Sequence, residues 1–147
     1  MPSLRLPSAR MVAVAWLNRL GLDAGCGLEL PADLDSWSEH GFVCVPVVAG
    51  GSPGRHVPMR SPVVQVDCWA CRPGSDVAPW GKAAELAEQV FAAAYQEPLR
   101  PQLAMPSGYA PVLLRAVYPV TEPREIPNDG AGFARLEIDM QFVWSAS

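Results

Sequence analysis

The sequence predicts an α+β fold in which two helices pack against a four-stranded, mainly antiparallel sheet, in the order α-β-β-α-β-β. Three observations support this prediction: a long apolar and polar alternation near the C-terminus, three further runs typical of strands, and two segments with the spacing of amphipathic helices. The order of elements follows from the positions of these segments along the chain.

The strongest signal is the alternation over residues 133–144. Successive side chains of a strand point to opposite faces, so one face of this strand is buried and the other is solvated or docked. Residues 112–120 predict the strand before it. The connector 121–132 carries the turn Asn128-Asp129-Gly130, which predicts an antiparallel hairpin with a projecting tip. The apolar set is Ala134, Leu136, Ile138, Met140, Phe142 and Trp144, and the polar set is Arg135, Glu137, Asp139 and Gln141.

Two further strands are predicted at residues 42–48 and 63–72, both rich in β-branched side chains. Pro46 lies within the first and cannot donate a hydrogen bond to a neighbouring strand. We therefore expect this strand to lie at a sheet edge or to carry a bulge at Pro46. The intervening residues 50–62 are rich in turn formers and predict an exposed hairpin loop.

Two helices complete the prediction. The first spans residues 8–20, with Ser8 as its N-cap and Gly21 just beyond its end. The second begins with Ser75 or Asp76 as its cap, includes Pro79 in its first turn and runs to about Tyr95. Its apolar stripe should pack against the sheet.

Residues 22–41 and 97–111 show no periodicity, and we interpret them as long loops within a single domain that spans residues 1–147. The first of these loops has five acidic residues and no Lys or Arg, and it accommodates a turn of helix near residues 34–37.

Composition limits the partners of the protein. The formal net charge of −4 disfavours a protein that binds the nucleic acid backbone, because such proteins neutralise phosphates with Lys and Arg. Half of the residues are hydrophobic and 18% are charged, which favours a subunit that buries part of its surface against copies or partners. No segment approaches the roughly 18 apolar residues of a membrane span, so we expect a soluble protein made in the cytoplasm.

The four cysteines are expected to be free thiols. Cys68 and Cys71 have the C-x-x-C spacing, but positions three apart on a strand point to opposite faces. A zinc site needs converging ligands, and no second C-x-x-C or histidine pair follows. Zinc binding is kept as the alternative.

No sequence motif indicates catalysis or a cofactor site, and we expect neither an enzyme nor a bound cofactor or metal. His40 and His56 lie in predicted loops and are interpreted as surface residues. Glu137 and Asp139 share a strand face, where paired carboxylates more often set register and partner choice than catalyse. Asp67 lies between apolar neighbours and should be satisfied by a cross-strand or subunit contact.

Five residues are candidates for interfaces between subunits or with partners. Tryptophan is enriched in interface anchors, and Trp80 begins a helix, whereas the periodicity of Trp16 and Trp144 predicts core positions. Pro46 marks a strand edge, and Asn128 lies at the tip of the projecting connector. The complete set is Pro46, Trp80, Glu137, Asp139 and Asn128.

Three segments together resemble the tail terminator proteins of long-tailed, siphovirus-type phages that infect actinobacteria. They are residues 64–70 (VQVDCWA), 83–94 (AAELAEQVFAAA) and 135–144 (RLEIDMQFVW). In that family a strand of the type hydrophobic-Gln-Val-Asp-Cys-Trp precedes an alanine-rich helix, and the chain ends on a long alternating strand. The order of elements over residues 8–144 agrees with this arrangement.

The resemblance implies a structural virion protein at the junction of tail and neck, assembled in the host cytoplasm. Such a protein forms a homohexameric ring that caps the tail tube protein, stops tube polymerisation and joins the tail to the head-tail connector or head-closure protein. DNA passes through the lumen as non-specific cargo. Two alternatives stay open: another ring component, such as a head-closure or tail tube protein, and a small enzyme or ligand-binding domain.

Overall fold

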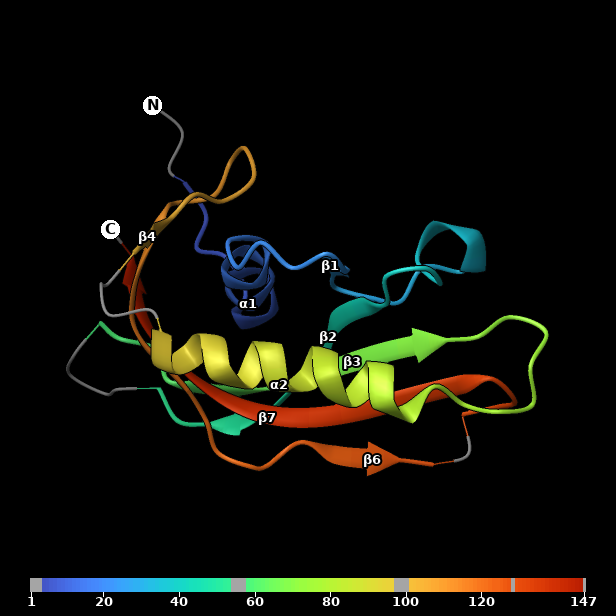
Figure 1. Cartoon of the computed structure of the whole chain (residues 1–147). Coiled ribbons are helices and arrows are strands. Elements are labelled where there is room, and N and C mark those ends of the chain that lie inside the picture. Colours follow the sequence, from blue (N-terminus) through green and yellow to red (C-terminus); the bar gives the residue numbers. More distant parts are fainter. Residues whose placement is uncertain (1–3, 54–57, 97–100, 128, 147) are drawn as a thin grey trace.

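The computed structural model describes residues 4–53, 58–96, 101–127 and 129–146, which form two α-helices and a curled seven-stranded sheet (Figure 1). The elements in chain order are α1 (Ala9–Asn18), β1 (Gly25–Gly27), the short 3-10 helix η1 (Leu34–Ser36), β2 (Phe42–Gly51), β3 (Pro62–Cys71), α2 (Trp80–Gln96), β4 (Gln102–Leu103), β5 (Val112–Pro119), β6 (Arg124–Ile126) and β7 (Phe133–Ala146).

The strand order is β1-β2-β3-β7-β5-β4, and β6 pairs with the first part of β7. All pairs are antiparallel except β1 with β2, so the sheet is mixed. The α+β class with two helices is confirmed, but the four-stranded sheet in the order α-β-β-α-β-β is wrong. Strands β1, β4 and β6 lie in segments interpreted as loops, and two or three residues are too few for periodicity to appear.

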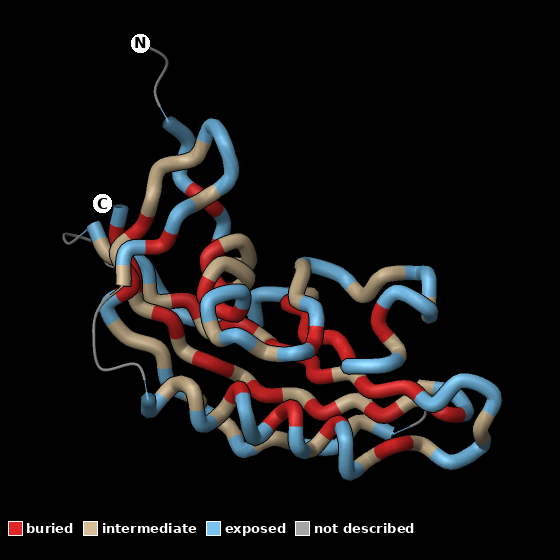
Figure 2. Tube along the Cα trace, turned by 45° about the horizontal axis from the view of Figure 1, so that its top comes forward, coloured by how far each residue is buried: buried red, intermediate tan, exposed pale blue. Residues whose placement is uncertain are grey.

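Both helices contribute to one core on the inner face of the sheet. The indole of Trp16 on α1 meets Phe142 of β7 edge-on at 5.6 Å, while α2 packs against β3, β5 and β7. Trp144 is also buried, so the core positions predicted for Trp16 and Trp144 are confirmed. Figure 2 shows buried residues along the middle of the strands and exposed residues in the loops at the ends. The alternating residues Ala134, Leu136, Ile138, Met140, Phe142 and Trp144 all belong to this core.

The helix starts differ in how well the sequence predicts them. The Ser8 hydroxyl accepts a hydrogen bond from the Met11 amide, which confirms the N-cap of α1. The start predicted for α2 is too early. The Ser75 hydroxyl accepts from the Val77 amide and so stabilises a turn, and the helix begins at Trp80, directly after Pro79.

The prediction for Pro46 is confirmed. The β2–β3 register shifts between Cys44 and Val47, which places Pro46 in an irregularity where no ladder hydrogen bond is required of it. Pairing with β1 extends only from Phe42 to Cys44, so Pro46 also lies on an open edge.

Strands β5 and β6 together run along one side of β7 like a single interrupted strand. The β5–β7 pairing is antiparallel, as the predicted hairpin requires, and β6 occupies part of the connector. Between them, the Val120 amide donates to the Asp139 carbonyl and the Asp139 amide donates to the Thr121 hydroxyl. Asn128, at the predicted tip, lies outside the described residues.

Neither of the two helices found in the described residues is long and apolar enough to cross a membrane.

Candidate interaction surfaces

The face of the sheet opposite the helices, called here the outer face, carries an ordered set of polar side chains. The strand registers align Trp69 with Arg135 and Asp67 with Glu137. On the other side of β7, Arg124 of β6 is aligned with Glu137. Residues aligned in this way point to the same face, so these side chains lie side by side across three strands.

Asp67 is the buried acid of this face, with 2% of its surface exposed. One carboxylate oxygen accepts from the Gln65 amide at 3.0 Å and the other from the Arg135 guanidinium at 3.2 Å. Burial raises the pKa of Asp67, and the contacts with Gln65 and Arg135 oppose this effect without cancelling it. The cross-strand partner expected for Asp67 is therefore Arg135.

Arg135 connects this acid to the loop before β7. Its guanidinium donates to both carboxylate oxygens of Asp129, at 2.9 and 3.1 Å, and its carbon lies 5.1 Å from the centre of the Trp69 ring. Burial alone would lower the pKa of Arg135, but its hydrogen bonds and ion pairs with Asp129 and Asp67 raise it above the usual value. The guanidinium thus stays charged and fixes the Asp129 loop against the sheet.

Glu137 and Asp139, two of the predicted interface residues, are bound within the chain. The Arg124 guanidinium lies 2.5 Å from Glu137 and 3.4 Å from Asp139. The Arg124 guanidinium also donates to Thr121 at 3.1 Å, and the second Asp139 oxygen, Oδ1, is buried with no hydrogen-bond partner in the described part of the chain. The ion-pair network of this face joins four carboxylates to two guanidinium groups: Asp67, Asp129, Glu137 and Asp139 with Arg124 and Arg135.

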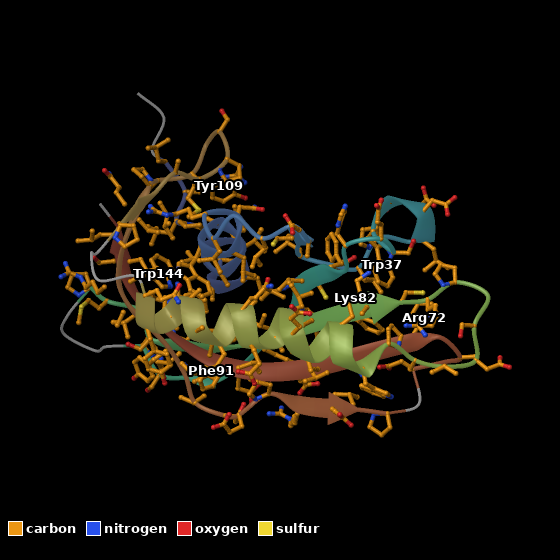
Figure 3. All side chains as sticks on the ribbon, viewed as in Figure 1. Trp37, Arg72, Lys82, Phe91, Tyr109 and Trp144 are labelled. Carbon is orange, nitrogen blue, oxygen red and sulfur yellow. The ribbon has the colours of Figure 1, made fainter. Side chains whose placement is uncertain are left out.

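Aromatic residues close one end of the outer face. Trp37 follows η1 and packs against Trp69 of β3 and Phe133 of β7, with ring centres 6.5 and 6.2 Å apart. Lys82 of α2 donates to the carbonyls of Ser38 and Glu39 and so ties this loop to the helix (Figure 3). A structural role for Trp37 was not predicted, because the loop that carries it has no periodic pattern.

The cysteines lie on both sides of the sheet. Cys68 belongs to the inner core and Cys71 to the aromatic cluster on the outer face, so the prediction of opposite faces is confirmed. All four are free thiols, and the described residues contain no group of three or more side chains suited to a metal ion. Burial raises the pKa of Cys26 to about 11 and that of Cys44 to about 12, which keeps both thiols protonated at neutral pH.

One edge of the sheet is open along the second half of β2, residues 47–51, called here the open β2 edge. Beyond Cys44 this strand pairs only with β3 among the described strands. Val47 and Val48 are 47% and 42% exposed, and no charged residue occurs in the segment. The Arg10 guanidinium donates to the carbonyls of Val45 and Leu28 where β1 ends, and it has no ion pair with a described carboxylate.

The opposite side of the sheet has a second open edge, residues 116–126, called here the open β5–β6 edge. β4 covers β5 only at Val112 and Leu113. Tyr118 and Val120 are 45% and 48% exposed. Glu122 is exposed at the corner between β5 and β6 and makes no ion pair within the described residues.

An apolar groove lies beside α1. It has a volume of about 530 Å³ and is bounded by the solvent side of the helix and by the segment after β4. Met11, Val14 and Ala15 form one wall, and Leu103 and Pro106 form part of the other. No sequence signal pointed to it, because its walls come from segments about 90 residues apart.

The remaining predicted positions are less open than expected or fall outside the structure. Trp80 is half-buried and packs against the inner core, so only part of its ring is available to a partner. Pro46 is half-buried at the start of the open β2 edge. His40 is exposed beside Glu39, and His56 lies outside the described residues.

No protein-family model matches the sequence, and a search of curated proteins found no match.

Proposed function

We propose that this chain is a structural subunit of a phage tail, of the tail terminator type, which assembles head to tail into a closed ring. The supporting observation is the position of four exposed apolar side chains. Val47 and Val48 lie on one edge of the sheet and Tyr118 and Val120 on the other. Two different, mutually complementary surfaces on one subunit produce head-to-tail association. Such association forms a ring when successive rotations between neighbouring subunits add up to a full turn.

The ring of this proposal has about six copies, as the resemblance implies. It caps the tail tube, stops its polymerisation and meets the head connector or head-closure protein on its other side. The net charge of −4 suits a surface that DNA passes without binding, because like charges repel. The protein has no enzymatic role and needs no cofactor or metal ion in this proposal.

Electron microscopy of the purified protein, with a mass measurement in solution, tests the proposal. We expect single rings that do not stack further when the protein is concentrated. Long tubes would instead assign the chain to the tube subunits, and a monomer that ignores added tail components would rule out both kinds of assembly.

The apolar groove beside α1 favours a second candidate, a small ligand-binding domain. Ligand pockets are typically apolar concavities of about 300–1,000 Å³, and the groove falls within this range. Native mass spectrometry of the protein as purified would detect a retained small molecule. A stoichiometric adduct that is lost in a Val14→Asp variant would favour ligand binding over ring formation.

A further inference from the structure

We propose that the open β2 edge of one copy pairs, as an antiparallel strand, with the open β5–β6 edge of the next copy. This proposal rests on the proposed ring and specifies the contact that builds it. The partner is a second copy of this chain, and the ladder continues the sheet from subunit to subunit.

The backbone of an edge strand favours such pairing. A strand with a neighbour on one side leaves a row of amide and carbonyl groups without strand partners on the other. Proteins usually protect such edges with charges or prolines, and residues 116–126 carry both, but residues 47–51 are Val-Val-Ala-Gly-Gly and contain neither. An added strand would satisfy these groups and cover Val47 and Val48.

Strand direction agrees with a cyclic arrangement. β2, β3, β7 and β5 alternate in direction along the sheet, so β2 and β5 are antiparallel within one subunit. Rotation about an axis close to the strand direction preserves the direction of every strand. β5 and β6 of the next copy therefore run antiparallel to β2, as a continuous sheet requires.

The strand register places an apolar side chain of one edge opposite an apolar side chain of the other edge. Val47 is aligned with Gln65, and Gln65 is aligned with Asp139. The Asp139 carbonyl accepts a hydrogen bond from the Val120 amide, so Val47 and Val120 lie at one level on opposite edges. With no shift between subunits, Val47 of one copy faces Val120 of the next, and two exposed apolar side chains cover each other.

Charge complementarity supports the same contact. Two residues before Val47, the Val45 carbonyl holds the Arg10 guanidinium, which has no described carboxylate partner. Two residues after Val120, on the other edge, is Glu122, which also has no ion pair in the described residues. Both residues lie at irregular points of the two edges, Arg10 beside the β2 irregularity and Glu122 at the corner between β5 and β6, and both are on the same side of the Val47–Val120 pair. The proposed contact therefore brings the free carboxylate of one copy toward the guanidinium of the next.

A double variant, Val47→Cys with Val120→Cys, tests the pairing directly. Within one chain β3 and β7 separate the two positions, and three strand spacings amount to roughly 14 Å. A disulfide needs Cα atoms within about 7 Å, so a bridge can form only between copies. Oxidation of the assembled protein should give a ladder of linked multimers on a non-reducing gel.

The matched control combines Val47→Cys with Val77→Cys and leaves Val120 unchanged. Val77 is an exposed apolar residue in the turn before α2 and lies on neither edge. The control should give no ladder. Intact rings that yield no ladder in the Val47→Cys, Val120→Cys variant would overturn the edge pairing while leaving the ring in place. A protein that is monomeric in every variant would remove the proposed function as well.

A charge exchange provides the second measurement. Glu122→Lys should weaken assembly about two- to five-fold, the size expected for an exposed ion pair, and high salt should reduce the difference. Adding Arg10→Glu should restore part of the lost assembly, because the exchanged charges attract again while the hydrogen bonds of Arg10 to the Val45 and Leu28 carbonyls are lost. Assembly that Glu122→Lys leaves unchanged at low salt would contradict the proposed contact between Glu122 and Arg10 of neighbouring copies.

Discussion

The two faces of β7 differ in what holds them in place. On the inner face, Ile138, Met140 and Phe142 are fully buried beneath the helices. On the outer face, Arg135 and Glu137 remain half-buried and are held by ion pairs across strands and loops. The inner face therefore provides most of the folding free energy, since apolar burial dominates stability, whereas partly exposed ion pairs contribute little. The outer face can present charge to a partner without weakening the core.

Truncating one residue on each face should give the largest difference between the two faces. Phe142→Ala removes a fully buried ring that packs on Trp16, and the unfolding free energy should fall by about 3–5 kcal/mol. Gln141→Ala, its neighbour on the outer face, loses hydrogen bonds to the Ser61 and Pro62 carbonyls and should cost about 1 kcal/mol. Urea denaturation measures both variants, and equal losses would show that the two faces do not differ in this way.

A second test concerns the one buried charge of the outer face. Asp67→Ala removes the carboxylate that Arg135 and Gln65 contact, and the unfolding free energy should fall by about 1–3 kcal/mol. The loss stays below the cost of breaking a fully buried pair because Arg135 keeps its contact with Asp129. A variant as stable as the original protein would show that the contacts of Asp67 add no net stability.

The pH dependence of the unfolding free energy also tests the role of Asp67. Because burial raises the pKa of Asp67 above its ordinary 3.8, the folded protein holds this proton more tightly than the unfolded chain does. The contribution of Asp67 therefore favours folding below about pH 3.8 and is lost as the pH rises through its folded-state pKa. Asp67→Asn should remove this part of the slope in unfolding free energy against pH. A slope identical in both proteins would mean that Asp67 titrates normally.

The smallest effect is expected at the cysteines, which lie on both faces. Their burial and raised pKa values should make alkylation by iodoacetamide slow at pH 8 in the folded protein and fast in urea. Treatment with EDTA should leave the thermal midpoint unchanged. A drop of several degrees that added zinc reverses would instead support the metal alternative.

The long elements were predictable because periodicity reports burial directly. The alternation of β7 correctly gave the buried set from Ala134 to Trp144, and Ser8 marked the start of α1. Strands β1, β4 and β6 were missed because elements of two or three residues owe their place to the neighbouring strand, not to their own pattern. The start of α2 was misplaced because Ser75 has two competing uses, as a helix cap or as a turn residue.

The candidate surfaces were predictable only in part. Pro46 indicated the open β2 edge, since a proline in a strand marks an edge or a bulge. The partner of Asp67 could not be named, because Arg135 lies 68 residues away and only the sheet register brings the two together. Arg10 and Glu122 gave no signal at all, as their alignment on opposite edges depends on four strands.

Native mass spectrometry shows directly whether the chain covers its two sheet edges by assembling with copies of itself. We expect a discrete species of about six subunits of 15.8 kDa, with little monomer at micromolar concentration. A single species of 15.8 kDa at every concentration, with or without tail components, would contradict this expectation.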